Sequence, residues 1–227
     1  MLSISATDEW RTAHPGAVIG LLELSGVENN THPSPRLDER KREVEARLRE
    51  RCKGFTRQDF LSLPVMSSYN RYYKHFSKTY HVLLQVESIV LKGKDLPDVC
   101  PLVDANFIAE VETLVLTAGH DAGKLYGPIL MDVSREGDHI TQMNGPSKTI
   151  RAGDMIMKDA YDVSCSIIYG QDNRSPISSE TTQVLYVAYA PAGVSSETVD
   201  THLQSIEENI RLFSPTAIVE RHQLLSA

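Results

Sequence analysis

The apolar positions of the first hundred residues recur mostly every three or four positions, which is typical of amphipathic helices. A Ser-Pro pair at 34–35 offers an N-cap and a first helical position, and a narrow apolar stripe of Leu37, Val44 and Leu48 follows it. Because charges of both signs surround this stripe at three- and four-residue spacing, the sequence predicts an ion-paired surface helix. The alternative is a helix that faces phosphate through basic residues, which are Arg47, Arg51, Lys53 and Arg57.

Three more segments have a helical period. Residues 67–80 place five aromatic side chains at helical spacing with cations between them, a pattern that predicts core packing and leaves stacking on nucleic-acid bases as the alternative. Residues 81–93 continue as a helix that Gly93 would end. A third apolar helix is expected from about Asp104 to Leu116, with Asp104 as its N-cap.

After Gly127 the pattern changes to short apolar runs, PILMDVS, DHITQMN, DMIMKDAY, VSCSIIYG and TQVLYVAYA, separated by Gly, Pro, Asn and Asp. Such runs predict strands joined by turns, as does the earlier run at 17–27. Residues 195–213 return to a helix capped by Ser195 or Ser196. Helices gathered first and strands gathered later predict an α+β fold. With no linker, we expect one domain over 1–227, with a mostly helical part at 1–100 and a core of one helix and many strands at 101–221.

Composition and charge narrow the function. The formal net charge of −7 argues against a general DNA- or RNA-coating protein, so any nucleic-acid contact is expected to be local. The three cysteines have no CxxC pairing, which predicts buried thiols and neither disulfides nor a zinc site. The amino terminus lacks the features of a signal peptide and no run is long enough to span a membrane, so we expect a cytoplasmic protein with no membrane partner.

Several polar residues stand where the surrounding pattern does not require them. Asp172 and Arg174 lie in a short polar segment between two strand-like runs, and a plain hairpin needs only turn residues. His120 and Asp121 are an adjacent imidazole and carboxylate, and Asn106 is an amide near the start of an apolar helix. The segment GHDAGKL does not fit a phosphate loop, and no HExxH or GxSxG motif is present, so we expect no metal and no cofactor.

Two stretches carry a resemblance to a known family. Residues 103–145 and 162–185 resemble the B3/B4 domain of the phenylalanyl-tRNA synthetase β subunit, and more closely the free-standing proteins that consist of this domain alone. The shared pattern is VDxxN, a helix, DxxKLxG, strands with a Glu-Gly turn, and a polar loop before ExT. Here these elements are Val103 to Asn106, Asp121 to Gly127, Glu136-Gly137, and Gly170 to Thr182.

The resemblance implies a three-layer β/β/α sandwich and an editing site that hydrolyses a wrongly esterified tRNA. It implies a ligand pocket lined by Asn106, His120, Asp121, Gln171, Asp172 and Arg174. Two positions depart from the family: Ala118 stands where the synthetase has a histidine, and Gln171 stands near the glutamate that recognises tyrosine. The resemblance therefore gives no specificity for tyrosine.

Two functions remain open from the sequence. The first is a stand-alone protein that binds tRNA or aminoacyl-tRNA and deacylates mischarged esters in trans. In this case Arg47, Arg51 and Lys53 are expected to contact the RNA. The second is a module of the same fold that binds RNA or an amino-acid-like ligand without catalysis. The sequence identifies neither the catalytic residues nor the amino acid, the tRNA or the oligomeric state.

Overall fold

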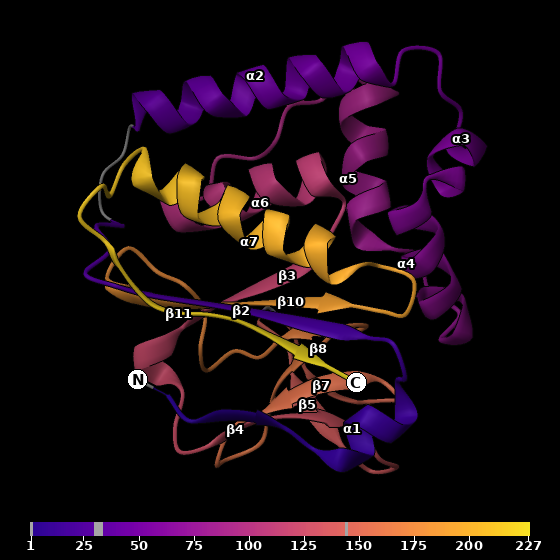
Figure 1. Cartoon of the computed structure of the whole chain (residues 1–227), viewed down its shortest axis with the longest axis vertical. Helices are drawn as coiled ribbons and strands as arrows, with labels where there is room; N and C mark the ends of the chain where they lie inside the picture. The colour runs from indigo at the N-terminus through magenta and orange to yellow at the C-terminus, as the bar shows by residue number, and fades with distance from the viewer. Residues whose placement is uncertain (1, 30–33, 144) are drawn as a thin grey trace.

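The computed structural model describes residues 2–29, 34–143 and 145–227, and it has three layers. A group of helices lies above a four-stranded sheet, and a five-stranded sheet lies below that sheet (Figure 1). The predicted α+β class and the β/β/α order of layers are confirmed. The largest apolar core is shared by the layers, since it includes residues from both sheets and from the helices.

The middle layer is an antiparallel sheet with the order β11-β2-β10-β3. Its central strands are buried along almost their whole length, which explains their nearly continuous apolar sequence. Gly20 of β2 allows the helix above to come close, because a Cβ there would lie 2.6 Å from Val199 Cγ1. The bounds of the four strands are β2 Val18–Ser25, β3 Thr117–Asp121, β10 Gln183–Ala190 and β11 Ile218–Ser226.

The outer layer is a mixed sheet with the order β1-β4-β7-β8-β9, in which only β1 and β4 pair in parallel. A two-stranded hairpin of β5 and β6 forms a further small sheet. The bounds of these strands are β1 Ile4–Ala6, β4 Ile129–Val133, β5 His139–Thr141, β6 Ser147–Thr149, β7 Met155–Lys158, β8 Val163–Ser166 and β9 Gly170–Gln171. The short helix α1 (Asp8–Ala13) lies beside β4 (Figure 1).

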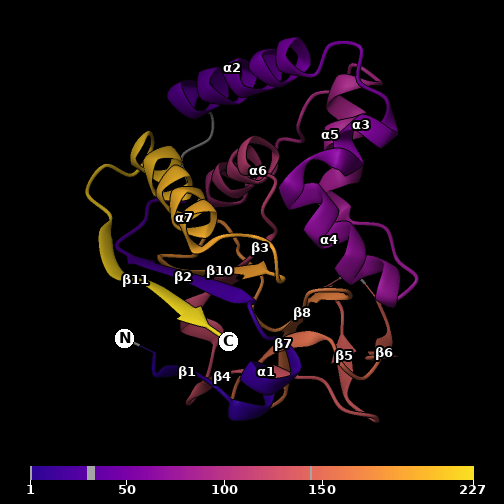
Figure 2. The same ribbon diagram turned by 45° about the vertical axis from the view of Figure 1, so that its right-hand side comes forward.

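The helical layer has two parts. Helices α6 and α7 lie over the middle sheet with α2 above them, and α3, α4 and α5 stand at one side (Figure 2). The bounds are α2 Pro35–Arg51, α3 Arg57–Ser62, α4 Pro64–His75, α5 His81–Val90, α6 Pro101–Thr113 and α7 Ser196–Arg211, with a single turn of 3-10 helix, η1, at Ala122–Lys124.

Helix α2 is the ion-paired helix that the sequence predicts. Arg40 and Arg47 both pair with Glu112 of α6, and Arg49 pairs with Asp95. Lys41 is fully buried, and its ammonium lies 2.8 Å from the buried Asp104 carboxylate of α6. This buried pair fixes α2 on α6, because removal of either partner would leave an uncompensated buried charge.

The aromatic pattern of residues 67–80 is core packing, as predicted. Tyr69, Tyr73, Phe76 and Tyr80 are buried, and the rings of Tyr69 and Tyr80 stack with centroids 4.2 Å apart. The helix is nevertheless shorter than predicted, since α4 ends at His75 and Tyr80 is the N-cap of the next helix. The alternative of base stacking by these buried rings is wrong.

Several other sequence predictions need correction. Asp104 is not the N-cap of α6, because the helix begins at Pro101 and the Asp104 carboxylate accepts from Val99 N and Lys41 instead. The helix ends at Thr113 and not near Leu116, and strand β3 at Thr117–Asp121 was not predicted. The strands β1 and β11 were not predicted. Asn144, the last residue of one predicted strand run, lies outside the described residues.

Candidate functional site

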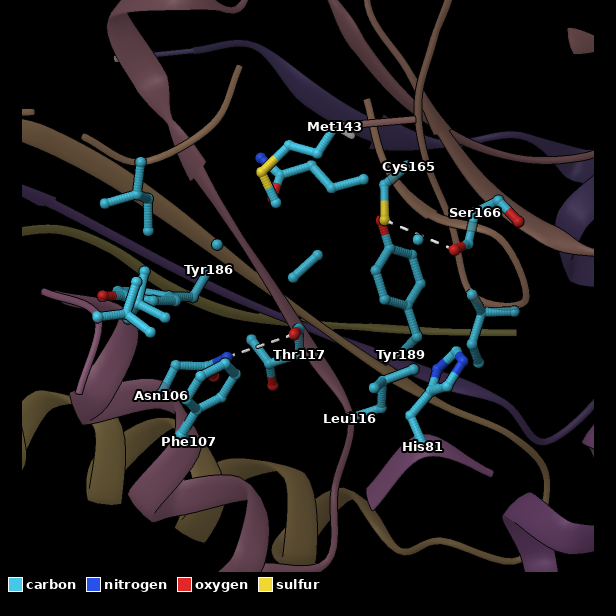
Figure 3. A pocket seen from close by; sticks show the side chains of 18 residues that line it. His81, Asn106, Phe107, Leu116, Thr117, Met143, Cys165, Ser166, Tyr186 and Tyr189 are labelled. Carbon is cyan, nitrogen blue, oxygen red and sulfur yellow. Dashed lines mark hydrogen bonds between the residues drawn. The ribbon is translucent and has the colours of Figure 1, made fainter. Parts of the chain in front are cut away.

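A cavity of about 330 Å³ lies where α6, the middle sheet and the outer sheet meet. Asn106 and Phe107 of α6 lie on one side of it, and Met143 and Cys165 lie on the other (Figure 3). The lining is mostly apolar, with a few amide, hydroxyl and imidazole groups, and it contains no Lys, Arg, Asp or Glu. The lining residues are His81, Val99, Val103, Asn106, Phe107, Leu116, Thr117, Ala118, Gly119, Met143, Cys165, Ser166, Ile167, Gly170, Gln171, Ile177, Tyr186 and Tyr189.

The corner between α6 and β3 forms one wall of the cavity. Leu114 adopts a left-handed conformation with φ 66°, which ends the helix and turns the chain toward β3. Glu110 is buried in the last turns of α6, and its Oε1 accepts from Thr117 N at 2.8 Å. This bond holds the first residue of β3 against the helix that carries Asn106.

Asn106 presents a polar atom that has no partner. Its Nδ2 donates to the Thr117 carbonyl at 3.4 Å (Figure 3), whereas its buried Oδ1 has no hydrogen-bond partner among the described residues. An unpaired buried acceptor costs roughly 1–3 kcal/mol. A ligand that donates an N–H or O–H to this oxygen would remove that cost.

Burial keeps Glu110 protonated near neutral pH. Removal from water raises the pKa of Glu110 to about 8, and hydrogen bonding with Thr117 N and with the side chains of Gln85 and Asn106 opposes this rise. The wall behind Asn106 therefore holds a neutral carboxyl group and no negative charge at pH 7.

The opposite end of the cavity carries Cys165, Ser166 and Tyr189, with the Tyr189 hydroxyl pointing at the Cys165 sulfur (Figure 3). Burial raises the pKa of the Cys165 thiol to about 12, so it is a neutral thiol and not a thiolate nucleophile. The Ser166 hydroxyl donates to Asp154 and accepts from Tyr169 N at 2.9 Å. Ser166 therefore links the chain after β8, through Tyr169 N, to the buried Asp154 carboxyl group.

His81, at the first position of α5, is the imidazole that lines the cavity. Its Nδ1 lies 3.3 Å from the Tyr73 hydroxyl. His81 is exposed overall, but partial removal of its ring from water and the nearby Lys78 lower its pKa, so the imidazole is neutral at pH 7. No pattern in the sequence pointed to this residue, because a single histidine outside any motif is indistinguishable from an ordinary surface histidine.

Two of the six predicted pocket residues, Asn106 and Gln171, line the cavity. His120 is fully buried behind Gln171: its Nδ1 lies 3.1 Å from Gln171 Nε2 and 2.7 Å from Ser175 Oγ. Burial lowers the pKa of His120 to about 3, with a smaller contribution from Arg174. His120 is therefore a neutral member of the internal network that positions Gln171.

The other three predicted residues have structural contacts away from the lining. Asp121 accepts from Thr181 Oγ1 at 2.9 Å and caps η1 through Gly123 N. Asp172 accepts from the hydroxyl of Ser175. Arg174 joins two carboxylates across the polar loop, with Nη1 3.0 Å from Asp159 and Nε 2.8 Å from Asp172. The paired charges of this loop thus bind each other.

The predicted basic positions lie on or just after α2. Arg47 is paired with Glu112 at 2.6 Å, while Arg51 and Lys53 are exposed. Helix α6 lies between α2 and the cavity, so these positions are not close to the cavity (Figure 2). Among the described residues, no group of three His, Cys, Asp or Glu side chains is arranged to hold a metal ion, and no helix is long and apolar enough to cross a membrane.

The fold and its cavity define an α+β sandwich with an internal, ligand-sized pocket. No family model matches the sequence, and no curated protein sequence matches it. Among solved structures, the chain is similar to an N-terminal fragment of the phenylalanyl-tRNA synthetase β subunit from Pyrococcus horikoshii, with a TM-score of 0.50 and 7% identity. The match covers 97% of this chain and 54% of the other, so the chain spans about half the length of that fragment. At this identity the similarity shows the fold.

The buried carboxyl of Glu110 predicts a pH-dependent stability. An ordinary glutamate has a pKa of 4.5, so the unfolded chain releases this proton first, and the free energy of unfolding should fall as the pH rises from 4.5 to about 8. The pKa of Asp154 is likewise raised from 3.8 to about 7, so the loss of its proton also lowers the free energy of unfolding as the pH rises through that range. Glu110→Gln keeps an acceptor for Thr117 N and removes the titration, so its stability should depend less on pH, by up to about 1.4 kcal/mol per pH unit.

Urea unfolding at pH 5, 6, 7 and 8 measures this difference. The steps between pH 5 and 7 are the most informative, because there the unfolded chain has released the Glu110 proton while the folded chain keeps it, and the contribution of Asp154 is shared by both proteins and cancels in the comparison. If the free energy of unfolding changes with pH equally in the wild type and in Glu110→Gln, the assignment of a neutral Glu110 is contradicted.

Proposed function

We propose that this protein binds aminoacyl-tRNA, or a related aminoacyl ester or amide, with the amino-acid side chain in the central cavity. The observation that carries the proposal is the apolar cavity with the unpartnered Asn106 oxygen in its wall. Pockets for small molecules have this character, with an apolar lining and a few polar groups that fix orientation. The resemblance to B3/B4 editing domains and the fold similarity to the synthetase fragment support a ligand related to tRNA.

The lining favours an esterified or amidated amino acid over a free one. A free amino acid has a carboxylate, which needs a cation or several donors when it is buried. None of the lining residues is a lysine or arginine. An ester or amide has no such charge, so it can enter this lining at a smaller desolvation cost.

Hydrolysis of the bound ester is the second candidate function, and His81 is the observation that favours it. A neutral imidazole in the lining can accept a proton from water that attacks the ester. The other candidate nucleophile in the lining, Cys165, is protonated. Any hydrolysis would therefore depend on His81 and on the position of a water molecule.

The first prediction concerns binding. Among the amides and free acids of leucine, methionine, phenylalanine and tyrosine, the tightest ligand should be an amide, and each amide should bind more tightly than its free acid. Asn106→Leu, which removes the acceptor at similar volume, should weaken the best amide about tenfold, the effect of losing one buried hydrogen bond. Isothermal titration calorimetry measures both quantities.

The matched control for this test is Asn70→Leu, an amide on α4 outside the cavity lining, which should bind the amides as the wild type does. Thermal unfolding of Asn106→Leu should show no large loss of stability, because the variant also removes an unpaired buried group. Free acids that bind as well as the amides, or no binding by any of these ligands, would contradict the proposal.

The second prediction separates hydrolysis from binding alone. If the protein is a deacylase, incubation with a panel of correctly charged and mischarged tRNAs should release amino acid above the buffer rate for some of them. His81→Gln should then lower this rate about 100-fold or more, the usual contribution of a general base, while binding of the best amide changes little. Ester loss at the buffer rate for every tRNA would leave the protein as a binding module.

The third prediction concerns the basic positions of α2. If Arg47, Arg51 and Lys53 contact phosphate, their replacement by glutamate should weaken tRNA binding and flatten its dependence on salt. Because Arg47 is paired with Glu112, the double variant of Arg51 and Lys53 is the cleaner test. If the double variant binds tRNA with the same affinity and the same salt dependence as the wild type, α2 is an ion-paired surface helix that does not contact RNA.

A further inference from the structure

A second hollow of about 390 Å³ adjoins the central cavity. The two share Met143 and Gln171, and Met143 is 49% exposed, so the shared residues lie where the cavity meets the surface. The remaining residues of this hollow, which we call the hairpin groove, are Gln142, Gly145, Pro146, Lys148 and Tyr169.

Tyr169 offers a firmly held aromatic face in the hairpin groove. Its amide N donates to Ser166 Oγ, and its carbonyl accepts from the Gln142 side chain. Ser166 is itself tied to the buried Asp154 carboxyl. The backbone of Tyr169 is therefore fixed from two sides, and the ring is half-buried and accessible from the groove.

Two lysines lie near the Tyr169 ring, one in the lining of the groove and one outside it. The Lys78 ammonium lies 5.9 Å from the centroid of the Tyr169 ring, and Lys148 lines the groove directly. Both lysines are exposed, and neither forms an ion pair with a carboxylate in the described part of the chain. No Asp or Glu lines the groove, although the whole chain has a net charge of −7.

An aromatic ring with two lysines nearby, neither of them in an ion pair among the described residues, matches the chemistry of a nucleotide. Bases stack on aromatic side chains, and lysines bind phosphate as point charges. We propose that the hairpin groove binds the terminal nucleotide of an aminoacylated RNA, with its base on Tyr169 and its phosphate near Lys78 and Lys148. The aminoacyl group would then extend past Met143 and Gln171 into the central cavity. This inference rests on the proposed function of that cavity.

The test compares two probes that differ only in the nucleotide. One is the amino-acid amide that binds best in the panel described above, and the other is the same amino acid joined through an amide to 3′-amino-3′-deoxyadenosine 5′-monophosphate. The nucleotide probe should bind the wild type about tenfold more tightly than the amide, because stacking and one phosphate contact are added. It should also show the steeper salt dependence.

Variants in the groove should affect only the nucleotide probe. Tyr169→Leu should weaken this probe about fivefold or more, whereas Tyr169→Phe, which keeps the ring, should not. Lys78→Gln and Lys148→Gln should each reduce its affinity and its salt slope. Lys92→Gln, an exposed lysine after α5, is the matched control and should have no effect.

The outcomes separate this inference from the function on which it rests. Equal binding of both probes to the wild type, or an equal loss of both in Tyr169→Leu, would overturn the nucleotide site and leave the cavity as the amide site. Failure of every amide to bind would instead overturn the proposed function, and the groove with it. Thermal unfolding of Tyr169→Leu and Tyr169→Phe shows whether a loss of folding explains any shared effect.

Discussion

The hydrogen bond from Thr117 N to the buried Glu110 carboxyl is the constraint on which the site depends. It joins the last turns of α6 to the first residue of β3, and both elements form walls of the central cavity. The carboxyl can occupy this position because it is neutral near pH 7, which avoids the large cost of burying a charge. The Tyr80 hydroxyl supports the same corner by donating to the Leu114 carbonyl at 2.8 Å.

This corner carries the Asn106 oxygen, which is one of two unpaired polar atoms on described residues of the cavity lining; the other is the Tyr189 hydroxyl. The Asn106 amide nitrogen donates to the Thr117 carbonyl, and the amide oxygen is buried with no hydrogen-bond partner among the described residues. Around this space the protein places neutral groups, since His81 and Cys165 are uncharged near pH 7. The unpaired charges lie outside, at Lys78 and Lys148, where the cavity opens toward the hairpin groove. An aminoacyl group without a free carboxylate inside and a phosphate outside fit this division of charge.

The sequence predicted the layers better than the site. Short apolar runs between turn residues identified β4, β7, β8 and β10, and Ser195, one of the two predicted caps, is the N-cap of α7. The end of α6 could not be predicted, because Leu114 adopts its left-handed conformation through tertiary contacts and not through its own preference. The unpredicted strand β11 has a mixed burial pattern, as expected for an edge strand, and so lacks a clear period.

The six predicted pocket residues show why sequence proximity is a weak guide to a site. His120 and Asp121 lie in a strand, where successive side chains point to opposite faces, so they could not both face one cavity. Asp172 and Arg174 are close in sequence and pair with each other, which leaves neither free for a ligand. Asn106 does line the cavity. It could be found from the sequence, because an amide near the start of an apolar helix is unusual.

A crystal structure of the protein with the tightest-binding amino-acid amide tests the central claim most directly. The account predicts the amino-acid side chain in the cavity between α6 and the two sheets, with a ligand N–H or O–H about 3 Å from Asn106 Oδ1. An empty cavity with the ligand bound elsewhere, or a bound ligand that leaves the Asn106 oxygen without a donor, would contradict it.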